Sequence, residues 1–127
     1  MTLDPIALKF LKDAAALGAP PIGELEPAQV RAGIKASGTG PGPEIHSTED
    51  MEMAGPEGPI PVRIYRPSDK TNLPALVYFH GGGWVIGDIE WNDGMCRQIS
   101  DQAGCVVISV EYRLAPEDVY PAAADDA

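Results

Sequence analysis

The feature that most constrains the fold of this chain is an apolar stretch that ends in three consecutive glycines. The run reads Val77-Tyr78-Phe79-His80-Gly81-Gly82-Gly83-Trp84. Glycine loses more backbone entropy on folding than any other residue, so ordering three in a row is unfavourable. Such a run suits a place where backbone N–H groups approach a ligand, for example the oxygen that gains charge during acyl transfer. The competing interpretation is a tight strand-to-helix turn that uses glycine only for positive φ.

Composition limits the function classes that remain. The chain has 127 residues, of which 44% are hydrophobic, so it can form one domain with a core. The 9 basic and 19 acidic residues give a net charge of −10, which argues against binding to nucleic acid or an anionic membrane. Charged residues interrupt the early apolar stretches, and no segment approaches the roughly 20 apolar residues of a membrane span. We expect a cytoplasmic protein without stable membrane insertion.

Cysteine and histidine are too sparse to predict a metal site. Cys96 and Cys105 are nine residues apart, with no CxxC spacing and no neighbouring histidine. We expect both to be buried free thiols. With only two histidines in total, His46 and His80, the chain has little material for a metal site. We predict neither a metal nor an organic cofactor.

The N-terminal third reads as two helices and a linker. Residues 4–17 have an amphipathic pattern, with Asp4 as a natural N-cap and Pro5 at the first helical position. A second helix is predicted over residues 27–36, and residues 37–43 are rich in glycine and proline. We therefore divide the chain into residues 1–43 and residues 44–127.

The second part has the pattern of an α/β fold. Alternation over residues 45–53 predicts a strand with one half-buried face, and residues 60–65 form its hairpin partner. Residues 75–79 and 105–110 read as strands buried on both faces. A helix over residues 91–103, with Met95, Cys96 and Ile99 facing inward, joins them into a parallel βαβ unit. Residues 122–127 read as the first turn of another helix.

Two motifs resemble one known family. His80-Gly81-Gly82-Gly83-Trp84 and Tyr112-Arg113-Leu114-Ala115-Pro116-Glu117, followed by residues 120–123 and 125–127, resemble the hormone-sensitive-lipase family of α/β-hydrolases, its bacterial carboxylesterases above all. The resemblance implies the N-terminal part of an α/β-hydrolase fold: a mostly parallel sheet with flanking helices. Residues 1–43 would be cap helices and a linker, and residues 44–127 the first part of the catalytic domain. Asp118 stands where the family often has histidine, at a position that is not catalytic.

The resemblance also implies roles for the residues of the glycine motif. The N–H groups of Gly82 and Gly83 would form the oxyanion hole, and Gly81 would shape the turn. His80 would orient the loop rather than act as acid or base, and residues 112–117 would buttress that loop. Trp84 either lines the substrate pocket or packs beneath the loop, and the sequence leaves both open.

The chain contains no serine in a G-x-S-x-G context. We therefore expect the N-terminal portion of a longer serine carboxylesterase, acting on short- to medium-chain acyl esters, with its Ser/Asp/His triad outside this chain. The 127 residues alone would be inactive. The expected partners are a small-molecule ester and the C-terminal remainder of the protein, and a homodimer stays open. The alternatives are a non-catalytic, receptor-like binding module on the same fold, and an amidase or lactone hydrolase.

Overall fold

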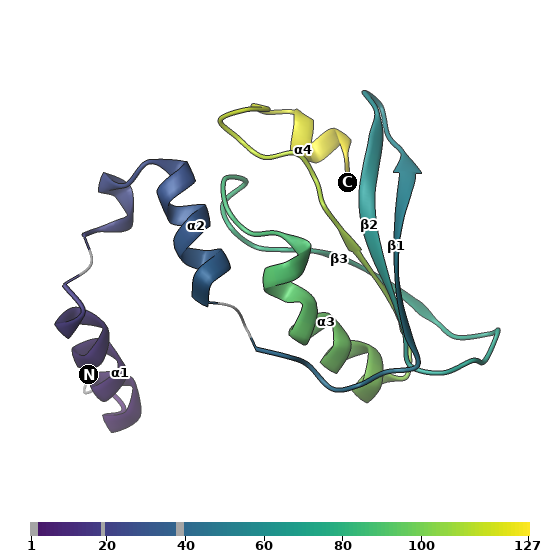
Figure 1. The fold of residues 1–127 in the computed structure, drawn as a ribbon, viewed down its shortest axis with the longest axis horizontal. Helices are drawn as coiled ribbons and strands as arrows, with labels where there is room; N and C mark the ends of the chain where they lie inside the picture. The colour runs from purple at the N-terminus through teal and green to yellow at the C-terminus, as the bar shows by residue number, and fades with distance from the viewer. Residues whose placement is uncertain (1–2, 19, 38–39) are drawn as a thin grey trace.

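The computed structural model describes residues 3–18, 20–37 and 40–127. The N-terminal helices are α1 (Pro5–Ala16) and α2 (Pro27–Ser37), separated by a 3-10 turn at Ile22–Glu24. The remaining elements, in chain order, are β1 (Ser47–Ala54), β2 (Pro59–Arg66), β3 (Ala75–Phe79), α3 (Ile89–Ala103), β4 (Val106–Val110) and α4 (Ala122–Asp125) (Figure 1). All the helices and strands predicted from the sequence are present. Gly38 and Thr39 of the predicted linker lie outside the described residues.

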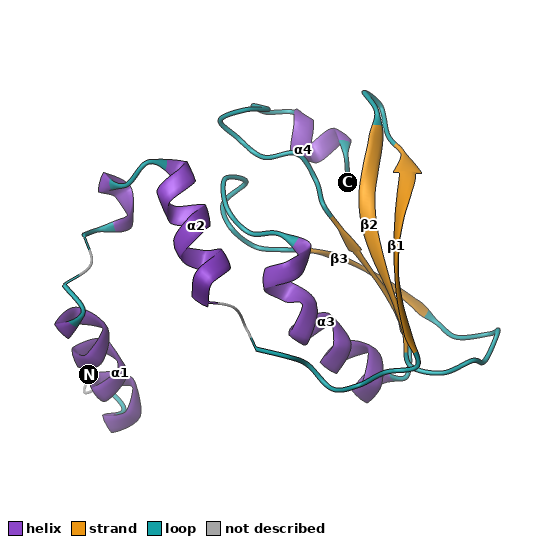
Figure 2. Cartoon of the chain, in the orientation of Figure 1, coloured by secondary structure: helices purple, strands orange, loops and turns teal. Residues whose placement is uncertain are grey.

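The four strands form one mixed sheet in the order β1-β2-β4-β3. The hairpin β1–β2 is antiparallel and its second strand pairs antiparallel with β4. β3 and β4 are parallel, and α3 forms the crossover between them, which confirms the predicted βαβ unit (Figure 2). The sheet was expected to be mostly parallel, but among the described strands only the β3–β4 pair is parallel, because the hairpin supplies the other two strands.

The main core lies between α3 and one face of the sheet. Side chains alternate along a strand, so Tyr65 of β2 and its cross-strand partner Val107 of β4 point toward the same face. Both are fully buried and pack with Cys96 of α3 and with Cys105. The two cysteines are free and buried, as predicted. The hydroxyl of Ser100 donates to the carbonyl of Cys105 at 2.8 Å, which fixes the end of α3 against the start of β4.

The inward face of α3 differs in one position from the prediction. Asn92, Cys96 and Ser100 follow a four-residue spacing and are all buried, and Ile99 packs at the edge of the same core. Met95 was expected to face inward, but it is 46% exposed. Its position is one residue from the buried row, and its sulfur accepts a hydrogen bond from the Tyr78 hydroxyl at 3.3 Å instead.

Two predictions about strand burial are wrong for the described structure. β1 was expected to bury one face, yet Met51 and Met53 are 45% and 53% exposed. β1 is an edge strand that pairs only with β2, so packing does not bury its alternating methionines. β3 was expected to be buried on both faces, yet Val77 is 53% exposed, because β3 lies at the opposite edge with β4 as its one neighbour.

An arginine links the hairpin to α3 through ion pairs. Arg63 of β2 binds Asp50 of β1 at 2.6 Å, Glu90 of α3 at 2.7 Å and Asp93 of α3 at 3.3 Å. These hydrogen bonds raise the pKa of Arg63 and lower the pKa of Asp50. The guanidinium therefore compensates three carboxylates that would otherwise repel one another.

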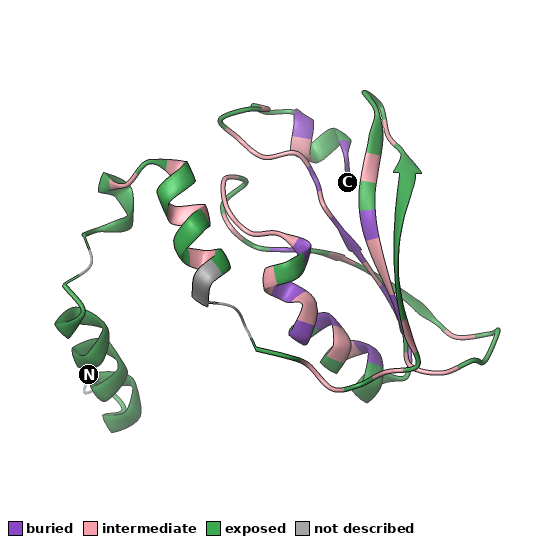
Figure 3. Cartoon of the chain, viewed as in Figure 1, coloured by how far each residue is buried: buried purple, intermediate pink, exposed green. Residues whose placement is uncertain are grey.

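The N-terminal helices lie to one side of the sheet (Figure 1). α1 begins as predicted: Asp4 accepts a hydrogen bond from the backbone N–H of Ile6 at 2.8 Å. None of its residues is buried, and Phe10 on its apolar face is 70% exposed (Figure 3). α2 lies beside α3, so the second helix rather than the first joins the N-terminal segment to the rest of the fold.

Candidate active site

The loop between β3 and α3 carries the three glycines, and its shape depends on two of them. The carbonyl of Gly82 accepts hydrogen bonds from the N–H groups of Val85 and Ile86, both at 3.1 Å. Gly82 has φ +140°, and a Cβ there would lie 1.8 Å from the Ile86 carbonyl oxygen. Gly83 has φ +60° with open space around its Cβ position. Gly82 is therefore required sterically, and the left-handed backbone conformation of Gly83 favours glycine.

Gly81 and Trp84, the neighbours of these two glycines, differ from each other in backbone conformation. Gly81 was expected to shape the turn, but its φ lies outside the left-handed region and a Cβ there would meet nothing within 4 Å. Trp84 has φ +60°, a left-handed conformation that costs a residue with a side chain about 1–2 kcal/mol. The turn therefore stores its strain at Trp84, directly after the glycines.

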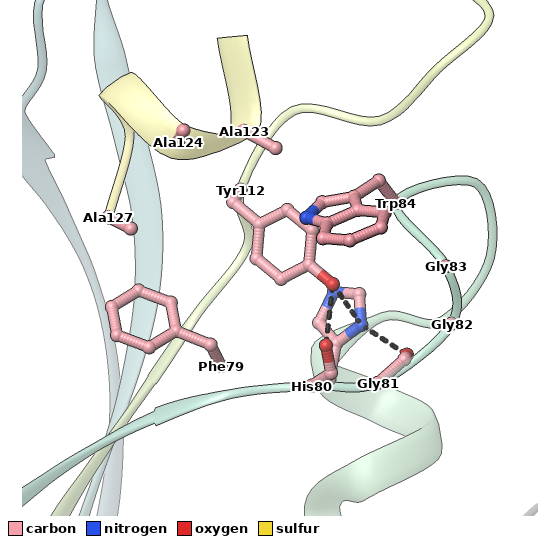
Figure 4. A pocket seen from close by; sticks show the side chains of 10 residues that line it. All are labelled: Phe79, His80, Gly81, Gly82, Gly83, Trp84, Tyr112, Ala123, Ala124 and Ala127. Atoms are coloured by element: carbon pink, nitrogen blue, oxygen red, sulfur yellow. Dashed lines mark hydrogen bonds between the residues drawn. The ribbon is translucent and has the colours of Figure 1, made fainter. Parts of the chain in front are cut away.

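His80 is buried and held by Tyr112. The two rings are stacked, with centroids 4.3 Å apart, and the Tyr112 hydroxyl donates to the His80 carbonyl at 2.5 Å (Figure 4). Nδ1 of His80 lies 3.0 Å from the Gly81 carbonyl oxygen, which can only accept. Nδ1 is therefore placed to donate to that carbonyl. Nε2 is buried without a hydrogen-bond partner among the described residues.

The segment after β4 supports the glycine loop from the other side. Besides the contact between Tyr112 and His80, the N–H of Ala115 donates to the carbonyl of Trp84 at 2.8 Å. Arg113 donates to Asp126 through its backbone N–H and its guanidinium, which lowers the pKa of Asp126 and ties α4 to this segment. These contacts agree with the buttressing role expected for residues 112–117.

A cavity of about 300 Å³ lies over the loop, and its walls are mostly apolar. Figure 4 shows the lining residues, which are Phe79, His80, Gly81, Gly82, Gly83, Trp84, Tyr112, Ala123, Ala124 and Ala127. A neighbouring cavity of about 480 Å³ shares Gly83 and Trp84 with the first. The indole of Trp84 is 69% exposed and borders both cavities, so it does not pack beneath the loop.

The described lining of the cavity lacks a nucleophilic side chain of the common kinds. None of its described lining residues is serine, threonine, cysteine or a carboxylate. Among the described residues no group of three or more His, Cys, Asp or Glu side chains could hold a metal ion. In that part of the chain, no helix combines the length and apolar character needed to cross a membrane. A reaction at this cavity therefore needs a nucleophile from outside its described lining residues.

Glu111 is a half-buried carboxyl beside this site that the sequence did not single out. Its Oε2 accepts a hydrogen bond from the N–H of Ile89 at 2.8 Å, at the start of α3. Burial raises the pKa of Glu111 above its ordinary value, and the hydrogen bond from the Ile89 N–H partly offsets this shift. A carboxyl with a raised folded-state pKa favours the folded state at low pH, and this contribution is lost as pH rises through that pKa.

The substitution Glu111→Gln is expected to remove this pH dependence. Glutamine can still accept from the Ile89 N–H, and it carries no charge to bury at neutral pH. Urea unfolding from pH 4 to pH 8 should show the stability of the variant rising relative to wild type as pH increases. A stability difference that stays constant over this range would contradict the prediction.

Comparisons with known proteins agree with the motifs. Residues 76–127 match a family model described as the alpha/beta hydrolase fold. The carboxylic ester hydrolase LipN of Mycobacterium tuberculosis is 49% identical over 88 residues, which cover 68% of this chain and 23% of that protein. An arylesterase of Saccharolobus solfataricus is 43% identical, over 65% of this chain and 27% of that protein. The chain thus spans about a quarter of the length of these curated relatives.

Solved structures extend the similarity to the N-terminal helices. A hyperthermophilic esterase from the archaeon Pyrobaculum calidifontis matches 99% of this chain and 41% of its own, with a TM-score of 0.87 and 41% identity. An α/β-hydrolase from the metagenome of Lake Arreo matches 98% of this chain and 42% of its own, with a TM-score of 0.85 and 42% identity. The sequence motifs and the sheet topology agree with these matches. The chain belongs to the hormone-sensitive-lipase family of α/β-hydrolases.

Proposed function

We propose that the protein is a carboxylic ester hydrolase and that this chain supplies its oxyanion hole through the N–H groups of Gly82 and Gly83. One observation carries the proposal: a loop with positive-φ glycines at both positions, the first of which has no room for a Cβ, borders an apolar cavity. Glycine leaves the backbone open to a substrate oxygen, because no Cβ covers the N–H groups. The esterase names of the relatives support the same reaction class.

The proposed reaction proceeds through an acyl-enzyme. A serine outside these 127 residues attacks the ester carbonyl, and a histidine takes its proton and passes it to the leaving alcohol. Water then attacks the acyl-enzyme with the same histidine as base, which releases the acid and restores the serine. Gly82 and Gly83 would stabilise the negative oxygen in both steps, and a donor of this kind contributes about 3–4 kcal/mol.

In this proposal the other residues of the site hold the loop or shape the cavity. His80 is stacked on Tyr112 and buried, which favours an orienting role for it over that of acid or base. The cavity of about 300 Å³ suits a short- to medium-chain acyl group. We also assign residues 1–43 to a cap beside the site. The two free, buried cysteines fit a cytoplasmic location.

Hydrolysis of p-nitrophenyl butyrate by the complete protein tests the proposed activity. We expect turnover that needs no added metal or cofactor. Binding of short-chain esters without turnover would overturn the proposal and favour a receptor-like module. Preferential cleavage of the corresponding amide, p-nitrobutyranilide, would identify an amidase that uses the same loop. Preferential cleavage of a lactone would identify a lactone hydrolase.

Removal of the Trp84 side chain is expected to change acyl-chain preference. Because Trp84 borders both cavities, Trp84→Ala should join them and admit longer chains. The kcat/KM ratio for p-nitrophenyl octanoate over the butyrate should rise by about tenfold, within the range of hydrophobic-pocket discrimination. Trp84→Phe retains a ring and should stay close to the wild-type ratio. Equal ratios in wild type and Trp84→Ala would show that the indole does not limit the acyl chain.

A further inference from the structure

Arg31 of α2 contacts the glycine loop from outside the cavity. Its Nε donates to the carbonyl of Val85 at 2.7 Å, and one terminal nitrogen donates to the carbonyl of Ala115 at 2.7 Å. The two terminal nitrogens also bind the carboxylate of Glu117, at 2.9 and 2.8 Å. One guanidinium therefore joins the N-terminal helix, the glycine loop and the segment after β4, which lie 54 to 86 residues away in sequence.

The carbonyl held by Arg31 belongs to the turn that presents the glycines. The N–H of Val85 donates to the carbonyl of Gly82, so the same residue is bonded to the glycine on one side and to Arg31 on the other. The carbonyl of the preceding Trp84 is held by the N–H of Ala115, whose own carbonyl binds Arg31. The loop and the segment after β4 thus share the guanidinium as their common donor.

The geometry of this contact suits arginine in particular. The guanidinium is planar and directs its donors as a rigid fork, which lets it bind two carbonyls and a carboxylate together. A lysine ammonium is a point charge that cannot reproduce this arrangement. The Arg31 side chain is 29% exposed, so its contacts with the loop are partly shielded from water. The hydrogen bonds with Glu117 raise the pKa of Arg31 and lower that of Glu117, so the pair stays charged at neutral pH.

We infer that Arg31 is a positioning residue that fixes the Gly82–Val85 turn through the Val85 carbonyl and so makes the rate of ester hydrolysis depend on the docking of α2. The part that concerns catalytic rate rests on the proposed function. The part that concerns the loop does not, because the contacts are present whatever the reaction.

Kinetics of the complete protein test the first part. In Arg31→Ala we expect kcat for p-nitrophenyl butyrate to fall by about tenfold, because the N–H groups of Gly82 and Gly83 would be slightly misplaced. The kcat is expressed per active site, with the sites titrated by a phosphonate ester. KM should change by less than about twofold, because the loop acts in the transition state. Millimolar guanidinium chloride should restore part of kcat by filling the vacated space, while an equal concentration of potassium chloride should not.

Two further variants separate positioning from charge and from folding. Lys35→Met removes a positive charge from an exposed position of the same helix and should leave kcat unchanged. Arg31→Lys keeps the charge but loses the fork, and it should lose about threefold or more in kcat. If Arg31→Ala fails to fold, Arg31→Lys carries the test. Wild-type kcat in Arg31→Lys or Arg31→Ala would overturn the inference.

Amide hydrogen exchange tests the second part without relying on activity. In Arg31→Ala the N–H groups of Val85 and Ile86 should exchange about tenfold faster, while the α3 amides around Ser100 stay as in wild type. Unchanged exchange at Val85 and Ile86 would overturn the inference even if the protein is an active esterase. Faster exchange in a protein without esterase activity would instead refute the proposed function and support the role of Arg31.

Discussion

Replacement of Gly82 with alanine is expected to lower kcat for p-nitrophenyl butyrate by about 100- to 1000-fold in the complete protein, as loss of an oxyanion donor does elsewhere. The added Cβ would lie 1.8 Å from the Ile86 carbonyl oxygen, a distance that no side-chain adjustment relieves. The turn must therefore open, which would displace the proposed donors, the N–H groups of Gly82 and Gly83. Measured KM should change little, since the ground-state ester depends less on these donors.

Gly83 and Gly104 provide a matched pair for the same claim. They have φ values of +60° and +62°, and a Cβ would meet nothing within 4 Å at either position. Alanine should therefore cost similar backbone strain at both sites, about 1–2 kcal/mol of stability. Only Gly83→Ala is expected to lower kcat as well, because Gly104 caps the end of α3, away from the cavity.

Circular dichroism and urea unfolding would establish that the three variants fold, and titration of active sites would correct for inactive protein. A Gly82→Ala variant that folds and retains wild-type kcat would contradict the assignment of the oxyanion hole. Equal losses of kcat in Gly83→Ala and Gly104→Ala would indicate that strain, rather than donor placement, limits the rate.

The 127-residue polypeptide by itself is expected to be inactive and to self-associate. β3 has β4 as its one neighbour, and its apolar side chains Leu76, Val77 and Phe79 are 39–53% exposed. An exposed apolar edge strand pairs readily with strands of other chains. Size-exclusion chromatography with light scattering should show species larger than a monomer, and p-nitrophenyl butyrate should not be turned over.

A charged substitution on β3 tests whether this edge strand causes the self-association. Val77→Lys should raise the monomer fraction, because a charged side chain on an edge strand opposes pairing between chains. Val119→Lys adds the same charge at a position that is 67% exposed and outside the sheet, and it should have little effect. A wild-type polypeptide that is monomeric and unfolds cooperatively would contradict the prediction.

The local structure of this chain was predictable because short-range chemistry determines it. The β-branched run of β4, the N-cap at Asp4 and the glycines of the β3–α3 loop each fix an element within a few residues. Burial was less predictable, because it depends on neighbouring elements. Val77 in β3 and Met51 in β1 have apolar patterns that suit a buried strand, but each occupies a sheet edge in the described structure.

In the candidate site, too, the local motif was predictable from the sequence, and the contacts between distant residues were not. The glycine motif predicted the loop, yet the sequence did not reveal that Gly82 and Gly83, rather than Gly81, have positive φ. The cavity above that loop fits the motif. Arg31 and Glu111 belong to no motif, and their contacts join residues far apart in the chain. No local pattern could have indicated them, because their roles arise only when the elements pack.

The central claim is that the N–H groups of Gly82 and Gly83 stabilise the negative charge of the reacting ester, while a serine elsewhere in the protein attacks its carbonyl carbon. The most direct measurement is to treat the complete protein with diethyl p-nitrophenyl phosphate and to locate the label by peptide mass spectrometry. We predict one diethylphosphoryl group per active site, on a serine outside residues 1–127, with loss of esterase activity in proportion. Labelling of Ser100, Ser109 or any other residue of this chain, or full activity without a label, would contradict the account.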